Sequence, residues 1–160
     1  MTTSRSARIL RTVMVILLAL TVGTPAFAHD HGCSLSALHG LYVFSATGFV
    51  TPSGVAAVPK AIVELIRFNG DGTVTTPAVT LTVDSQAPLA LSPGAPGTYT
   101  VADLAPRDAA CLGTLTFSGG NTFNLVFPHD GEPRIWLIQT NPNPGNVGNV
   151  LQGAAVKIAH

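Results

Sequence analysis

The carboxylate of Glu64 stands in the middle of a mainly apolar run, residues 61–68 (AIVELIRF). Alternate side chains of an extended strand share a face, so Glu64 lies on the same face as Ile62, Ile66 and Phe68. A carboxyl group buried on such a face needs a partner, and its pKa rises. It could then act as an acid, a base or an anchor for a ligand. The alternative is that the two faces of the strand differ little in polarity and that Glu64 is exposed to water.

Arg134 and Trp136 share one face of a second extended segment, residues 134–140 (RIWLIQT). If that face points into a cavity, the guanidinium and the indole could clamp an anionic or aromatic ligand. Tyr42 and Tyr99 could donate hydrogen bonds in the same cavity. The alternatives are that Arg134 ends a strand at the surface, that Trp136 packs in a core or an interface, and that both tyrosines are packing residues.

The run His29-Asp30-His31 could bind a metal ion if the chain is cut just before it. The new α-amine, two deprotonated backbone amides and the His31 side chain would then suit Cu(II) or Ni(II) in a square plane. A copper site could instead use the terminal His29 with a distant histidine, and those available include His39 and His129. The alternative is a polar segment that binds no metal. No other cofactor is indicated.

A cut at that place is expected from the start of the chain. Three basic residues precede an apolar run at 13–20, and a small-x-small pattern ends at Ala28; the basic residues are Arg5, Arg8 and Arg11. This order is typical of a secretory signal peptide, and the apolar run is too short to span a bilayer. We therefore expect a signal peptide over 1–28, one domain over 29–160, and a secreted or periplasmic location without stable membrane insertion.

Charge and cysteine usage agree with that compartment. The whole chain has eight basic and eight acidic residues, and loss of the three arginines leaves a mildly acidic domain without a basic cluster. Such a surface argues against nucleic acid and anionic membranes as partners. Cys33 and Cys111 most simply form one disulfide in an oxidising compartment, with two free thiols as the alternative. Their spacing is not that of a zinc site.

The elements that must position these residues are strands. About eight short segments with strand character follow one another between turn residues; they are 38–50, 61–68, 73–83, 97–102, 111–118, 122–127, 134–140 and 149–158. The turn at 69–72 (NGDG) predicts a tight hairpin. Pro77 is expected at a bulge or an edge because proline cannot donate to a ladder. Residues 85–96 and 141–148 are expected to be loops, and the first of these could cover an opening.

Successive hairpins predict an antiparallel meander, which closes most economically into an up-and-down barrel because closure removes exposed edges. A two-sheet sandwich is the alternative. Glycines inside the strands slightly favour the barrel, since tight barrels need bends; they are Gly40, Gly48, Gly113 and Gly153.

Four short motifs resemble, in order, those of a class of small secreted bacterial proteins with calycin-type barrels. They are residues 40–44 (GLYVF), 68–72 (FNGDG), 97–101 (GTYTV) and 111–115 (CLGTL). The broad group includes lipocalins and allene-oxide-cyclase-like barrels. The resemblance implies a fold and no site residues. The Gly-x-Trp signature of lipocalins is absent, because Gly40 is followed by Leu41 and Tyr42.

Three functions are compatible with this sequence. The first is a small apolar-ligand-binding barrel, because barrel mouths often form pockets and the chain is apolar for its charge content. The second is a structural or surface-interaction barrel with a filled interior. The third is a barrel cyclase or isomerase, in which Glu64, Tyr42 or Arg134 would supply acid–base chemistry. The sequence favours the first and leaves the ligand and the oligomeric state open.

Overall fold

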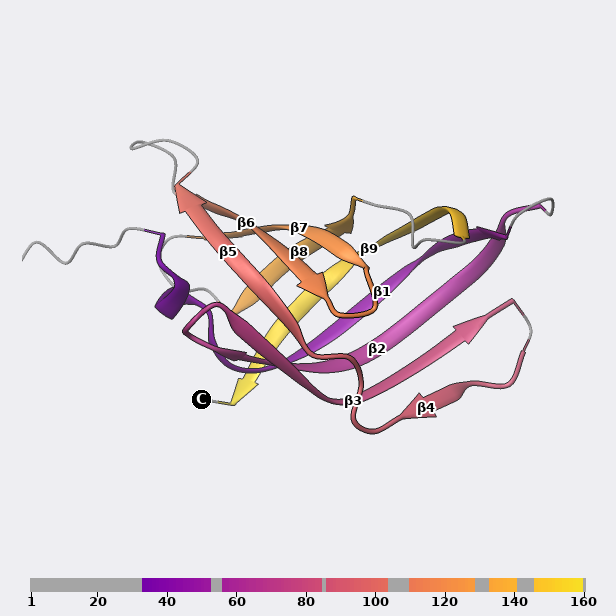
Figure 1. Ribbon diagram of the computed structural model, residues 1–160, viewed down its shortest axis with the longest axis horizontal. Helices are drawn as coiled ribbons and strands as arrows, with labels where there is room; N and C mark the ends of the chain where they lie inside the picture. The colour runs from indigo at the N-terminus through magenta and orange to yellow at the C-terminus, as the bar shows by residue number, and fades with distance from the viewer. Residues whose placement is uncertain are drawn as a thin grey trace, which may run out of the picture. The chain divides into compact units, whose positions relative to one another are not determined.

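The computed structural model describes residues 33–52, 56–84, 86–103, 110–128, 133–140 and 146–159. The expected signal peptide and the His29-Asp30-His31 run lie outside these residues. The described part contains a short 3-10 helix, η1 (Leu35–Ala37), and nine strands (Figure 1). The strands are β1 (His39–Pro52), β2 (Val58–Asn69), β3 (Thr73–Val83), β4 (Leu89–Leu91), β5 (Gly97–Asp103), β6 (Ala110–Phe117), β7 (Thr122–Pro128), β8 (Arg134–Gln139) and β9 (Asn146–Ala159).

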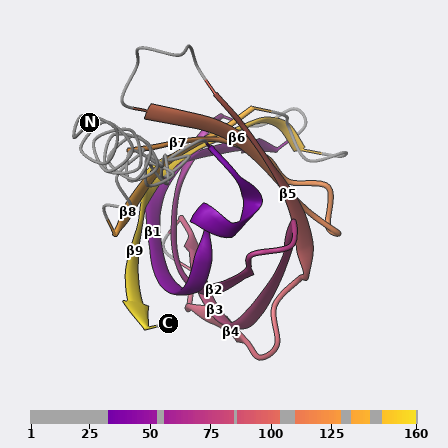
Figure 2. The same ribbon diagram turned by 90° about the vertical axis from the view of Figure 1, so that its left-hand side faces the viewer.

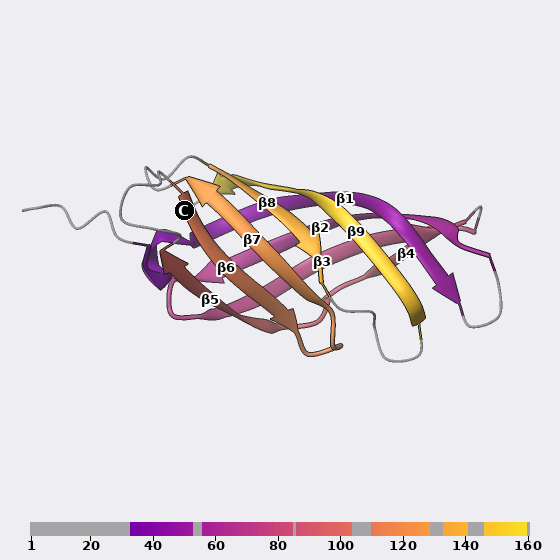
Figure 3. The same ribbon diagram turned by 90° about the horizontal axis from the view of Figure 1, so that it is seen from above.

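Eight of these strands close into an antiparallel barrel, which Figures 2 and 3 show from one end and from above. β1 pairs with β2, β2 with β3 and β3 with β5, and each later strand pairs with the next until β9 returns to β1. The short β4 pairs with the C-terminal half of β3. The predicted up-and-down barrel of about eight strands is confirmed, and the two-sheet sandwich is not formed.

Local sequence explains much of this arrangement. In β7, Phe123, Leu125 and Phe127 are buried and alternate with exposed neighbours, as expected for a strand with one face in a core. The hairpin between β2 and β3 places Gly70 and Gly72 at φ values of 81° and 93°. Those angles favour glycine, so the predicted tight turn is confirmed.

A bulge in β3 lies at Pro77. Opposite β2, Leu65 pairs with Ala78 and Arg67 with Thr75, so the register slips by one residue between them. This confirms the expectation that proline would stand at a bulge. The slip also changes the alternation, because Thr76 and Val79, three positions apart, are both buried.

Aromatic side chains and η1 close one end of the barrel. The rings of Tyr42 and Tyr99 each pack edge-on against Phe68, with centroid distances of 5.2 Å and 5.0 Å. The Tyr99 hydroxyl lies 2.8 Å from the carbonyl oxygen of Leu35 and 2.9 Å from that of Leu38. The barrel interior at this end is therefore filled by packed rings. Figure 2 shows η1 lying over the same end, where the Tyr99 hydroxyl is hydrogen-bonded to it.

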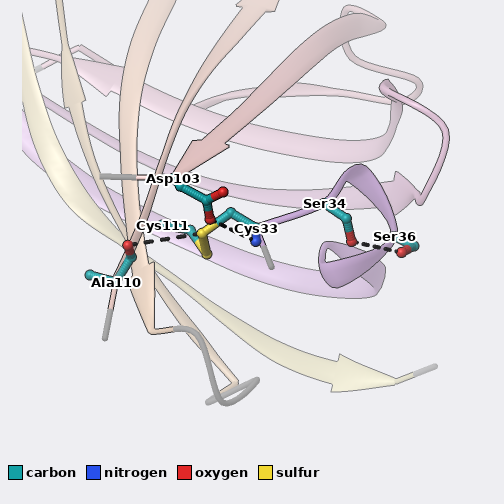
Figure 4. The surroundings of a disulfide bond; sticks show 6 residues. All are labelled: Cys33, Ser34, Ser36, Asp103, Ala110 and Cys111. Carbon is teal, nitrogen blue, oxygen red and sulfur yellow. Dashed lines mark hydrogen bonds between the residues drawn. A yellow bond between two sulfur atoms is a disulfide. The ribbon is translucent and has the colours of Figure 1, made fainter. Parts of the chain in front are cut away.

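The Cys33–Cys111 disulfide fastens the same end, as predicted. It joins the residue two positions before η1 to the buried start of β6 (Figure 4). The backbone N–H of Cys33 also donates to the Asp103 carboxylate at 3.0 Å. The segment that carries η1 is thus held covalently and by hydrogen bonding to β5 and β6.

Two expected loops are partly strands. Residues 85–96 include β4, and the final strand begins at Asn146, three residues before its predicted start. Three residues between prolines are too few to show an alternating pattern, so β4 is visible only through its pairing with Val79, Thr80 and Leu81. Residues 141–145 of the other predicted loop lie outside the described residues.

Gly153 permits a close approach of β9 to β1. A Cβ atom there would overlap the Ser45 carbonyl oxygen and come within 2.7 Å of the Ala46 Cβ. We expect Gly153→Ala to lower the free energy of unfolding by about 1–3 kcal/mol, the usual cost of overpacking. Urea denaturation measures this, with Gly119→Ala as control because nothing lies within 4 Å of a Cβ there. Equal effects of the two substitutions would contradict the close packing.

Candidate functional site

A cavity of about 150 Å³ lies inside the barrel, in the half away from η1. The N-terminal half of β2 contributes to it, whereas η1 lies near Gly72, in the turn that follows β2. The walls are mostly aliphatic and aromatic, with a few polar groups; they are Lys60, Ile62, Glu64, Val79, Leu81, Leu91, Ala95, Phe117, Asn121, Phe123 and Leu151.

Glu64 is the carboxyl group of this cavity. It stands between Phe44 of β1 and Val79 of β3 in the ladder, and only 7% of its surface is exposed. Burial raises the pKa of its carboxyl to about 7, and a hydrogen bond with the Thr76 side chain opposes part of that rise. The structure thus places Glu64 inside the barrel rather than in water.

The Thr76 hydroxyl links Glu64 to the chain segment after β4. It donates to the carbonyl oxygen of Ala95 at 2.8 Å, and Thr76 is only 2% exposed. A hydroxyl carries one hydrogen, so while that hydrogen points to Ala95 the hydrogen in the Glu64–Thr76 bond must come from Glu64. When the Thr76 hydrogen points to Glu64 instead, the bond favours the ionised carboxyl, which is the effect that opposes the rise in its pKa.

The segment that follows β4 forms one wall of the cavity. The Gly94 N–H donates to the Thr76 carbonyl at 2.9 Å, and the Ser92 hydroxyl donates to the Pro77 carbonyl at 3.0 Å. Leu91 and Ala95 line the cavity from this segment. Leu91, the last residue of β4, and Ala95 thus place part of the expected loop 85–96 against the cavity, and Figure 1 shows β4 running beside β3.

Lys60 stands where the cavity meets the outer surface. It also lines a groove of about 550 Å³ with Phe49, Asp84 and Gln152 among its other walls. Burial lowers the pKa of its ammonium group, since a desolvated cation is disfavoured. Lys60 lies four residues before Glu64 in the same strand. Alternate residues of a strand share a face, so an inward Glu64 predicts an inward Lys60. This signal was not used to predict the direction of Lys60.

Two further polar groups near the site were not found from sequence. Thr76 lies two positions after the buried Val74, so both residues face inward in the part of β3 before the bulge at Pro77. Asn149 is 4% exposed, shares the inward face of β9 with Leu151, and has no hydrogen-bond partner for its side-chain amide among the described residues. Nothing in the local sequence distinguishes Asn149 from a loop residue, and it was placed only as the start of a strand.

The two tyrosines predicted to line a cavity lie elsewhere in the barrel. Tyr42 and Tyr99 are buried in the closed end against Phe68, and neither lines the cavity around Glu64. Burial raises the pKa of Tyr42 to about 12. The structure therefore does not bring the tyrosines together with Glu64.

Arg134 and Trp136 face outward, so the condition for an interior clamp is not met. Both are exposed, and they alternate along β8 with the buried Ile135 and Leu137. Their alternation was predicted correctly, but alternation alone does not say which face is inside. The outer face around Trp136 carries a groove separate from the interior cavity.

The proposed copper or nickel ligands His29 and His31 lie outside the described residues. Across the described ranges, no three His, Cys, Asp or Glu side chains gather closely enough to hold a metal ion. Within the same ranges, no helix is long and apolar enough to cross a membrane.

Sequence and structure comparisons add no assignment to this geometry. Searches against family models, curated proteins and solved structures find no match to the chain.

Proposed function

We propose that the protein binds a small, mainly apolar molecule with one hydrogen-bond donor in the cavity beside Glu64. The observation that carries this proposal is a cavity of about 150 Å³ whose apolar walls surround a buried carboxyl group. A binding pocket of this kind combines a hydrophobic lining with a few placed polar groups.

The size of the cavity limits the ligand. An engineered cavity of about 150 Å³ lined by Leu, Ile and Phe admits one benzene molecule. The present cavity has a similar volume and lining, so it suits a ligand of about one six-membered ring. The filled end of the barrel, with the edge-on rings of Tyr42, Phe68 and Tyr99, leaves no room for a longer ligand to extend toward η1.

The polar end of the ligand follows from the hydrogen bonds of Glu64. When Glu64 is protonated, its O–H can donate to the Thr76 hydroxyl oxygen while the Thr76 hydroxyl donates to the Ala95 carbonyl oxygen. The second carboxyl oxygen then remains an acceptor, which a ligand hydroxyl or N–H could satisfy. The site thus favours a ligand with a hydrogen-bond donor, such as an alcohol, over a ligand with only an acceptor, such as a ketone.

Cyclohexanol is a suitable probe for this proposal. We expect calorimetry or NMR titration to detect binding to the wild type, and Leu151→Phe to weaken it at least about tenfold by filling the cavity. Val150→Phe is the matched control, because Val150 adjoins Leu151 but faces outward and is exposed. If Leu151→Phe unfolds the protein, Ala95→Leu fills the same cavity from its other wall. Unchanged affinity in a folded cavity-filling variant would refute the proposal.

Absence of any cyclohexanol binding would favour the alternative of a structural or surface-interaction barrel. The packed aromatic end is the observation that supports this alternative. A cyclase or isomerase would have to use Glu64 and Lys60 in the cavity, because Arg134 and Tyr42 do not line it.

Secretion and a calycin-like fold are parts of the same proposal. The Cys33–Cys111 disulfide supports an oxidising compartment, either periplasmic or extracellular. The eight-stranded up-and-down topology supports the resemblance to calycin-type barrels.

A further inference from the structure

The outer face of β1, β7, β8 and β9 carries a shallow groove of about 500 Å³, within the usual range of small-molecule sites. Figure 3 shows these strands side by side. None of its lining residues also lines the interior cavity. They are Thr47, Asn124, Val126, Trp136, Leu137, Ile138, Gln152, Gly153 and Ala154.

Strand register arranges this face in two adjacent rows. One row runs across four strands as Asn124, Ile138, Gln152 and Thr47. The next row runs as Val126, Trp136, Ala154 and Ser45. Val126, Trp136 and Ile138 form the apolar centre of this face. The amides of Asn124 and Gln152 lie diagonally across from Trp136 on the two neighbouring strands.

Trp136 is the largest side chain on this face. It is 46% exposed, and its partner on β9 is the small Ala154. The face of an indole ring carries negative electrostatic potential. It attracts groups with partial positive charge, such as the axial C–H groups of a pyranose ring.

Polar side chains surround Trp136 with unused hydrogen-bonding capacity. Asn124, Gln152 and Thr47 are exposed and make no side-chain hydrogen bond within the described part of the chain. A side-chain amide both donates and accepts, which matches the two roles of neighbouring sugar hydroxyls. The lining contains no charged residue. An uncharged groove complements a neutral ligand rather than an ionic one.

We propose that this groove is a binding site for a neutral carbohydrate, with one pyranose ring packed on Trp136 and its hydroxyls bonded to Asn124 and Gln152. Two exposed amides that lie diagonal to an exposed indole carry the proposal. The groove lies on the outer face of the barrel and the cavity lies inside it. An experiment that refutes one of the two proposed sites therefore leaves the other proposal standing.

Tryptophan fluorescence tests this site directly, because the chain contains a single tryptophan. The probes are cellohexaose and maltohexaose, neutral glucose hexamers with β- and α-linkages. We expect at least one to change the Trp136 emission at millimolar concentration, with little dependence on added NaCl because no charge is involved. NMR titration supplies the affinity for variants without tryptophan.

Matched variants separate the groove from the rest of the surface. Trp136→Ala should weaken binding at least about tenfold, Trp136→Phe less, and Gln152→Ala about fivefold. Val63→Ala, which removes an equally exposed apolar side chain from β2, should leave the affinity unchanged. Two results would overturn the proposal: neither hexamer binds, or binding survives Trp136→Ala. A wild-type dimer that Trp136→Ala converts to monomer would assign the groove to a second copy and would also overturn it.

Discussion

Replacing Glu64 with Gln is expected to raise the free energy of unfolding by about 3 kcal/mol above pH 8 and to change it little below pH 4.5. In the unfolded chain this carboxyl has its ordinary pKa of 4.5, whereas in the barrel burial raises the pKa to about 7. Between those values the folded state holds the proton more tightly than the unfolded state does. Stability therefore falls as the pH rises from 4.5 to 7, and the loss is complete above 7.

Glutamine keeps the neutral form of the site at every pH. Its side-chain N–H₂ can donate to Thr76 as the protonated carboxyl does, so the bond from Thr76 to Ala95 is preserved. In the wild type above pH 7, the ionised carboxyl has no proton to give and competes with Ala95 for the single hydrogen of Thr76. We expect this competition to loosen the segment after β4 as well as to lower the stability.

Urea denaturation of both proteins across the pH range measures the difference. The exposed Asp71 gives a control whose stability changes with pH in the opposite direction. Hydrogen bonds from Thr73 lower the pKa of its carboxyl, so this group stabilises the fold at higher pH. Asp71→Asn should therefore remove a stabilising contribution that is present at higher pH. If wild type and Glu64→Gln have parallel pH profiles, Glu64 is not buried as described.

Removing the disulfide is expected to destabilise the barrel by about 4 kcal/mol, the chain-entropy value for closing a long loop. The bridge spans 78 residues and fixes η1 over the packed end of the barrel. A double variant, Cys33→Ala with Cys111→Ala, avoids placing a hydroxyl at the buried Cys111 site, which is 1% exposed.

Guanidinium denaturation of this double variant should show a lower midpoint than the oxidised wild type. Reducing agent should bring the wild type to the same midpoint and leave the variant unchanged. Equal midpoints for the oxidised wild type and the variant would contradict a stabilising role for the bridge.

Most of the fold could be predicted because its signals are local. The turn at 69–72, the alternation of β7 and the bulge at Pro77 each follow from residue chemistry over a few positions. The strand β4 could not be predicted, because three residues between prolines carry no periodicity and its existence depends on pairing with β3.

The candidate site could be predicted only in part. An alternating pattern says which residues share a face, and Glu64 was correctly grouped with Ile62 and Ile66. The inward direction of that face depends on the closed barrel, as does the outward direction of Arg134 and Trp136. The link from Glu64 to Ala95 depends on the segment after β4 folding back against β3, which no local sequence pattern reveals.

The most direct test is an NMR titration of the Glu64 side-chain carboxyl carbon, with and without saturating cyclohexanol. The structure predicts a pKa of about 7 for the free protein. It should fall when cyclohexanol binds, because a donated hydrogen bond favours the ionised carboxyl. A pKa near 4.5, or one that cyclohexanol leaves unchanged, would contradict a ligand site beside Glu64.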